Sequence, residues 1–144
     1  MGGLLARVGL IGAIVVGGWI FRDYLTGAAV DLEVGDCFDA PSYVGEVDEV
    51  PHHPCTDQHD AEVFFVADYP ASDAFPGEDA FDAFTDANCV PAFATYTGLD
   101  FYASDYDIGV LYPTEEGWGQ GDHEIACYAV RTDAAKMTTS IRRQ

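Results

Sequence analysis

Basic side chains are scarce in this sequence. Six Lys and Arg residues stand against 25 Asp and Glu, which gives a formal net charge of −19 at pH 7, and Lys136 is the only lysine. Proteins bind phosphate backbones through clustered Lys and Arg, so this balance excludes nucleic acid as a partner. An anionic lipid surface would repel the soluble part of the chain for the same reason. The composition favours an acidic, solvated surface, or weak contacts with cations and basic partners.

The local sequence signatures of common enzymes are also missing. The chain has no nucleophile elbow, HExxH pair, P-loop or dinucleotide-binding glycine pattern. These motifs mark hydrolases, metalloproteases and nucleotide-dependent enzymes. We therefore expect a protein without enzymatic activity and without a cofactor.

No CxxC pair is present, although the chain has four cysteines, Cys37, Cys55, Cys89 and Cys127. Zinc-ribbon and thioredoxin-like proteins depend on that pair, so both classes lose their main signature. An even number of widely spaced cysteines in a small domain predicts two disulfides, provided that the compartment is oxidising.

The N-terminus carries a long uncharged run. It covers 14 residues from Val8 to Phe21. Counting from Leu4 gives 18 positions, which include Arg7 about one turn from the end, where its side chain could snorkel. We expect residues 1–29 to form an uncleaved membrane anchor; the alternative is a signal peptide cleaved near Ala29, which would release a secreted protein. The cysteines place the domain of residues 30–144 outside the cytoplasm. The anchor residues are Val8, Ile11, Ile14, Trp19 and Phe21.

Alternating and continuous apolar segments predict an antiparallel sheet. The apolar run within residues 61–69 is typical of a central strand that is covered on both faces. Residues 113–123 are rich in glycine and are predicted to form a loop. The predicted strands cover residues 32–38, 44–50, 61–69, 106–112 and 124–131, with a short last strand at 138–141.

Residues 78–98 are predicted to be helical, with Gly98 ending the helix. Pro91 lies inside this segment, and proline disturbs a helix interior, so we expect a kink where two helical pieces meet. Helical spacing places Cys89 opposite the apolar face. That face consists of Ala80, Phe84, Ala87 and Ala94. The fold class is therefore α+β: an antiparallel sheet with a kinked helix packed on one face, preceded by one N-terminal hydrophobic helix.

Three motifs occur in order along the chain. They are V-G-D-C-F at Val34 to Phe38, C-x-x-x-H-x-A-E-V at Cys55 to Val63, and W-x-x-G-D-H at Trp118 to His123. With the helix segment from Cys89 to Gly98 between them, these motifs resemble the septum formation domain family of actinobacterial and related membrane-anchored proteins. The resemblance extends over residues 32–141. Members often have Pro where this chain has Gln58, and Arg where it has His123.

The resemblance implies an extracytoplasmic domain of the cell envelope, held by a single membrane pass and linked by name to septum formation in cell division. It implies no defined chemistry. We expect the domain to bind a protein or cell-wall partner. The structural motif residues are His59, Glu62, Trp118, Gly121 and Asp122.

Four cysteines permit three disulfide pairings. We favour Cys37 with Cys55, and Cys89 with Cys127. The first bond would close a hairpin-like unit, and the second would join the helix to a late strand.

Two alternative sites use the histidines. His52, His53 and His59 lie close to Cys55, and imidazole and thiolate are ligands of zinc and copper, so a metal-binding domain is the alternative function. Adjacent residues of an extended segment point to opposite faces, which weakens this hypothesis. Asp122 and His123 with His59 would be needed for acid–base chemistry.

Aromatic residues near the glycine-rich loop are candidates for a partner surface, because aromatics are enriched at interfaces. Core packing is the alternative for each of them. They are Phe101, Tyr102, Tyr112 and Trp118.

Overall fold

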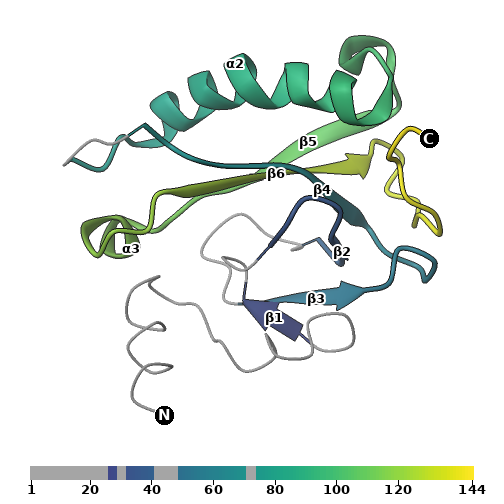
Figure 1. Ribbon diagram of the computed structural model, residues 1–144, viewed down its shortest axis with the longest axis horizontal. Coiled ribbons are helices and arrows are strands. Elements are labelled where there is room, and N and C mark those ends of the chain that lie inside the picture. Colours follow the sequence, from purple (N-terminus) through teal and green to yellow (C-terminus); the bar gives the residue numbers. More distant parts are fainter. Residues whose placement is uncertain (1–25, 29–31, 41–48, 71–73) are drawn as a thin grey trace.

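The computed structural model describes residues 26–28, 32–40, 49–70 and 74–144 (Figure 1). The predicted anchor, including Val8, Ile11, Ile14, Trp19 and Phe21, and the cleavage position at Ala29 lie outside these ranges. Among the described helices, none combines the length and the apolar character that crossing a bilayer requires.

The domain is α+β, as predicted, with one main helix on an antiparallel sheet. The strands lie in the order β1-β3-β2-β4-β6-β5. The sheet curls, so that β1, β2 and β3 lie beneath β4 and β6 on the side away from helix α2 (Figure 1). The elements are β1 (Thr26–Ala28), β2 (Cys37–Phe38), β3 (Glu49–His53), β4 (Ala61–Asp68), α2 (Glu78–Thr97), the 3-10 helix η3 (Phe101–Ala103), β5 (Tyr106–Leu111), α3 (Glu115–Gly119) and β6 (Glu124–Arg131).

Strand β4 is central and contains a β-bulge. Val63 pairs with Tyr128 and Phe65 pairs with Cys127, so Phe64 is the extra residue. A bulge interrupts the strict alternation of a strand. As a result Phe64 and Phe65 both pack with the helix-side core, whereas Val63 packs in the core on the other face. This confirms the prediction of a strand covered on both faces.

Two cores lie on opposite faces of β4. The helix-side core is aromatic, and Phe64 packs edge to face on Phe93 of α2 with ring centroids 5.6 Å apart. The smaller core lies between β4 and the curled part of the sheet, where Phe38 packs on Tyr128 at 5.2 Å. Edge-to-face aromatic pairs add to the stabilisation from burial.

Helix α2 is one continuous helix from Glu78 to Thr97, and the predicted division into two pieces at Pro91 is wrong. Pro91 is exposed. Proline removes the hydrogen bond to the carbonyl four residues earlier, which belongs to Ala87. Ala87 is exposed as well, so water can satisfy that carbonyl and the helix continues. Gly98 ends the helix in the left-handed conformation at φ 77°, as predicted.

The predicted apolar face of this helix is only partly correct: Phe84 packs in the helix-side core, but the alanines do not define the face. Ala87 and Ala94 are exposed, and Cys89 is fully buried rather than opposite the core. The face that packs on the sheet follows the aromatic residues and the disulfide, because these bury far more area than alanine methyl groups. Its buried residues are Phe81, Cys89, Phe93 and Thr97.

Two disulfides join the predicted partners. Cys37 on β2 bonds to Cys55 before β4, and Cys89 on α2 bonds to Cys127 on β6, with Cα atoms 5.3 and 6.2 Å apart. The second bond fixes the helix to the sheet. Closing loops of 18 and 38 residues stabilises by about 3–4 kcal/mol each in the chain-entropy account.

Further segments differ from prediction, and of the strand predicted at residues 32–38 only Cys37–Phe38 is a strand. Residues 115–119 form α3 within the predicted loop, because Thr114 caps the helix by accepting a hydrogen bond from the Gly117 N–H. Residues 138–141 form no strand; instead Met137 makes an isolated bridge with His59. Strand β1 pairs with β3 and lies in the segment assigned to the anchor region.

Gly109 on edge strand β5 offers a test of this packing. A Cβ added there would overlap the Tyr128 ring, which cannot swing away without leaving Phe38. We predict that Gly109→Ala lowers the free energy of unfolding by about 1–3 kcal/mol, as overpacking does. Urea denaturation measures the change. Gly119→Ala is the control, because nothing lies within 4 Å of a Cβ there; equal effects of the two substitutions would contradict the prediction.

Candidate functional site

Glu62 on β4 is a fully buried carboxyl group. Its Oε1 accepts hydrogen bonds from the hydroxyls of Tyr96 and Ser140, each at 2.6 Å, and its Oε2 accepts from the Ile141 N–H at 2.8 Å. Burying a carboxyl group is costly unless its oxygens are hydrogen-bonded. Three donors from two distant segments meet this requirement.

These hydrogen bonds hold the C-terminal segment against the end of helix α2. The Arg143 N–H adds a bond of 2.9 Å to the Tyr96 carbonyl. The side chain of Arg143 crosses Gly98, where an added Cβ would lie 3.4 Å from Arg143 Cδ. The sheet, the helix and the C-terminus thus converge around Tyr96.

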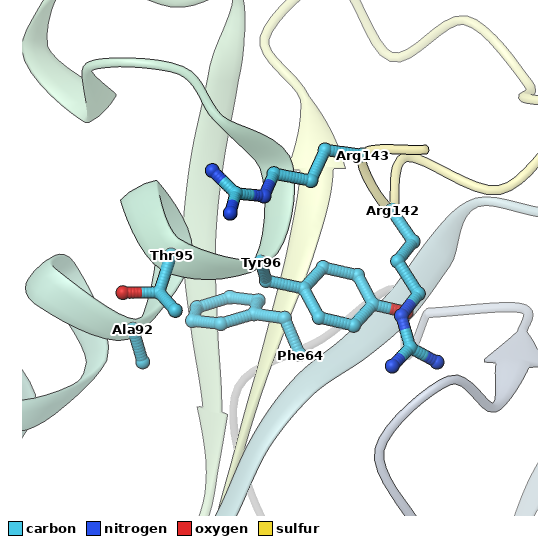
Figure 2. Close-up of a pocket in the computed structure, with 6 residues that line it drawn as sticks. All are labelled: Phe64, Ala92, Thr95, Tyr96, Arg142 and Arg143. Carbon is cyan, nitrogen blue, oxygen red and sulfur yellow. The ribbon is translucent and has the colours of Figure 1, made fainter.

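A groove of about 510 Å³ lies where these elements meet (Figure 2). Aromatic and methyl groups and a hydroxyl line it on the sheet and helix side, and two guanidinium groups lie at its C-terminal side. Its volume falls in the range of ligand-binding pockets. The lining residues are Phe64, Ala92, Thr95, Tyr96, Arg142 and Arg143.

The two arginines of the groove have no acidic partner among the described residues. Arg131 pairs with Asp133, and Lys136 pairs with Asp39 and Asp60. No described carboxylate lies within 4.0 Å of Arg142 or Arg143. In so acidic a chain, a pair of cations without carboxylates marks a distinct surface.

Arg142 and Tyr96 also interact directly. The Arg142 guanidinium lies 5.6 Å from the centroid of the Tyr96 ring, which is a cation–π distance. Burial of the hydroxyl, and its hydrogen bond to Glu62, raise the pKa of Tyr96 well above the ordinary value of 10.0. Tyr96 therefore stays a neutral donor to Glu62 while its ring faces a cation.

The structure does not assemble the predicted histidine metal site. His52 is buried, whereas its neighbour His53 reaches Asp39 at 2.8 Å. This is the opposite-face arrangement of adjacent strand residues. His59 Nδ1 bonds to the Asp57 carbonyl at 2.8 Å. Among described residues, the set of three potential ligand atoms within 4.8 Å of one another includes no histidine.

That set consists of Cys37, Cys55 and Glu62. The two sulfur atoms are joined in a disulfide, so they are not thiolates and do not act as metal ligands. The carboxyl group already accepts three hydrogen bonds. The cluster is part of the core.

The W-x-x-G-D-H motif builds the turn into β6. Trp118 is buried, and its ring lies 4.0 Å from that of His123. Gly121 has φ 95°, a value that favours glycine. Asp122 accepts a hydrogen bond from the Glu124 N–H at 3.2 Å, which confirms that it pins the loop. Burial raises the pKa of the Asp122 carboxyl.

The residues proposed for acid–base chemistry lie apart. His59 precedes β4, whereas the His123 carbonyl accepts a hydrogen bond from Tyr69, just after β4 ends. Eight strand residues span about 26 Å. His59 therefore cannot share a proton with Asp122 or His123.

The predicted aromatic surface is not one surface. Trp118 belongs to the core, where it packs on Phe81, and Phe101 packs on Phe93. Tyr102 and Tyr112 are exposed, at 81% and 41%, but they lie at opposite ends of β5. Arg142 and Arg143 were not among the predicted site residues, although they are the only two adjacent basic residues in the chain.

Two disulfides, a curled antiparallel sheet and one main helix define a small domain of the kind that folds in an oxidising, extracytoplasmic compartment. Within that class the chain belongs to the Septum formation family, whose family model matches residues 34–144. The resemblance inferred from the motifs is therefore confirmed. No curated protein and no solved structure matches the chain.

Tyr96→Phe tests the hydrogen bonds of Glu62. It removes one donor to a buried carboxyl group, so we predict a loss of about 1.5–3 kcal/mol of unfolding free energy at neutral pH. Because the folded pKa of Tyr96 is raised, this contribution is complete below pH about 10 and is lost as the pH rises toward the folded pKa. Urea denaturation at neutral pH and above pH about 10 should show the difference between wild type and variant shrinking.

Tyr102→Phe is the control, because this tyrosine is 81% exposed. It should leave the unfolding free energy unchanged at either pH. A Tyr96→Phe deficit that stayed constant, or grew, with rising pH would contradict the assignment.

Proposed function

We propose that this chain is a non-enzymatic, membrane-tethered domain of the cell envelope that binds a protein or cell-wall partner at the groove between α2 and the C-terminus. The observation that carries this proposal is the pair of arginines at this groove, which have no acidic partner among the described residues, in a chain of net charge −19. Charge of one sign at a hollow surface attracts and orients a partner of the other sign.

The use of the family's motif residues supports binding rather than catalysis. Glu62 accepts three hydrogen bonds inside the core, His59 bonds to a backbone carbonyl, and Asp122 accepts a hydrogen bond from a turn amide. Each contact stabilises a local conformation. General acid–base groups instead need to reach a substrate proton.

The sequence supports the membrane tether, and the disulfides support the extracytoplasmic compartment. Residues 1–29 carry the uncharged run from Val8 to Phe21, and we propose that it remains as a single membrane-spanning segment. Two disulfides suit the outer side of the membrane. The family description, septum formation, supports a role at the site of cell division.

Site-specific photo-crosslinking in intact cells tests the proposal. A crosslinking side chain at Thr95, inside the groove, should capture a partner in the membrane fraction. The same side chain at Asp86, an exposed position of α2 outside the groove, is the matched control and should capture much less. Equal capture at the two positions, or capture only by soluble material, would contradict a tethered domain with this binding site.

A further inference from the structure

The groove has the chemistry to recognise a particular class of ligand. It combines two guanidinium groups, one hydroxyl, and a small apolar floor made by the partly exposed Ala92 and the edge of the buried Phe64 (Figure 2). A guanidinium presents a planar fork of N–H donors that matches a carboxylate with two parallel hydrogen bonds. The floor suits an apolar side chain next to that carboxylate.

We infer that the groove binds a linear peptide segment of a partner protein in which an Asp or Glu stands beside an apolar residue. This inference rests on the proposed function and specifies its ligand. The carboxylate contacts Arg143, whose guanidinium lies on the Thr95 side of the Tyr96 ring, and the neighbouring apolar side chain packs on Ala92 (Figure 2). Arg142, on the other side of that ring, adds positive charge to the groove.

The backbone of both arginines is held by hydrogen bonds, and each side chain rests on a neighbouring group before any ligand arrives. The stem of Arg143 packs over Gly98, and its N–H is bonded to the Tyr96 carbonyl. Arg142 lies over the Tyr96 ring, and its N–H is bonded to the Ser140 hydroxyl. Side chains that are ordered in advance lose less conformational entropy on binding.

Thr95 supplies a polar contact for the peptide backbone. Its hydroxyl donates to the Pro91 carbonyl at 3.2 Å, which leaves the oxygen lone pairs free to accept an N–H from a ligand. The groove therefore offers hydrogen-bond donors for a carboxylate and an acceptor for a backbone amide. A peptide with an acidic side chain has both of these groups.

Charge over the rest of the chain favours a peptide over a membrane. An anionic bilayer would face the whole acidic surface, with 25 Asp and Glu against six Lys and Arg. A single peptide carboxylate is attracted by the two nearby arginines. Its repulsion by acidic groups farther away than about 10 Å is screened by salt. The same argument disfavours a long polyanion.

Two short probes test the inference by NMR titration of the full chain in non-ionic detergent. The probes are acetyl-Leu-Glu-amide and its uncharged match, acetyl-Leu-Gln-amide. We expect the Glu probe to shift the Thr95 and Tyr96 amides and the side-chain Nε–H of both arginines, in a saturable way. The Gln probe should bind at least about tenfold more weakly, the loss expected for one charged contact of about 1.4 kcal/mol.

Substitutions locate the site. Arg143→Gln should weaken the Glu probe by about tenfold and Arg142→Gln by less, with amide shifts of β6 unchanged to show that the sheet is intact. Arg131→Gln is the matched control, because Arg131 is paired with Asp133 elsewhere on the surface; it should leave binding unchanged. Equal binding of the Glu and Gln probes, or no saturable shift in the groove, would overturn the inference.

Competing occupants give different results. Inorganic phosphate that binds as well as the Glu probe would show a general anion site, and arginine-dependent binding to phosphatidylglycerol vesicles would show a lipid site. Arginine-dependent self-association would show a second copy of this chain in the groove. Each overturns the peptide assignment. Partner capture at Thr95 without probe binding would overturn it too but leave the proposed function standing, whereas absence of capture would remove the proposed function itself.

Discussion

The buried carboxyl group of Glu62 is the constraint on which the rest of this structure depends. Its oxygens need donors because water cannot reach them. The chain supplies those donors from Tyr96 on the helix, and from Ser140 and Ile141 near the C-terminus. One polar group thus joins the central strand to the helix end and to a segment 79 residues away. The groove exists because these three segments meet there.

The disulfides and the charge distribution complete this arrangement. Cys37 is the cross-strand neighbour of Glu62, and the Cys37–Cys55 bond packs beside the carboxyl group. The Cys89–Cys127 bond holds the helix on the sheet, so that Tyr96 is in reach of Glu62. The remaining described cations, Arg131 and Lys136, pair with acidic groups, which leaves the cationic character of the domain at the groove.

Sequence reasoning predicted the features that follow from local patterns. Strands β4, β5 and β6 carry dense β-branched and aromatic residues, and of the three possible disulfide pairings the favoured one is the one that forms. The helix face was only partly predicted, because alanines at helical spacing were interpreted as core residues, and Pro91 is tolerated because its side of the helix is exposed. The groove could not be predicted, because Arg142 and Arg143 gain meaning only when the distant Glu62 folds the C-terminus back.

Amide hydrogen exchange at Ile141 and Arg143 tests the central claim most directly. If Glu62 holds the C-terminal segment on the helix, both amides are protected in the wild-type protein. Glu62→Gln, which keeps the shape but weakens the acceptor, then accelerates their exchange while amides of β6 stay protected. Unprotected amides at Ile141 and Arg143 in the wild type, or protection that survives Glu62→Gln, would contradict the account.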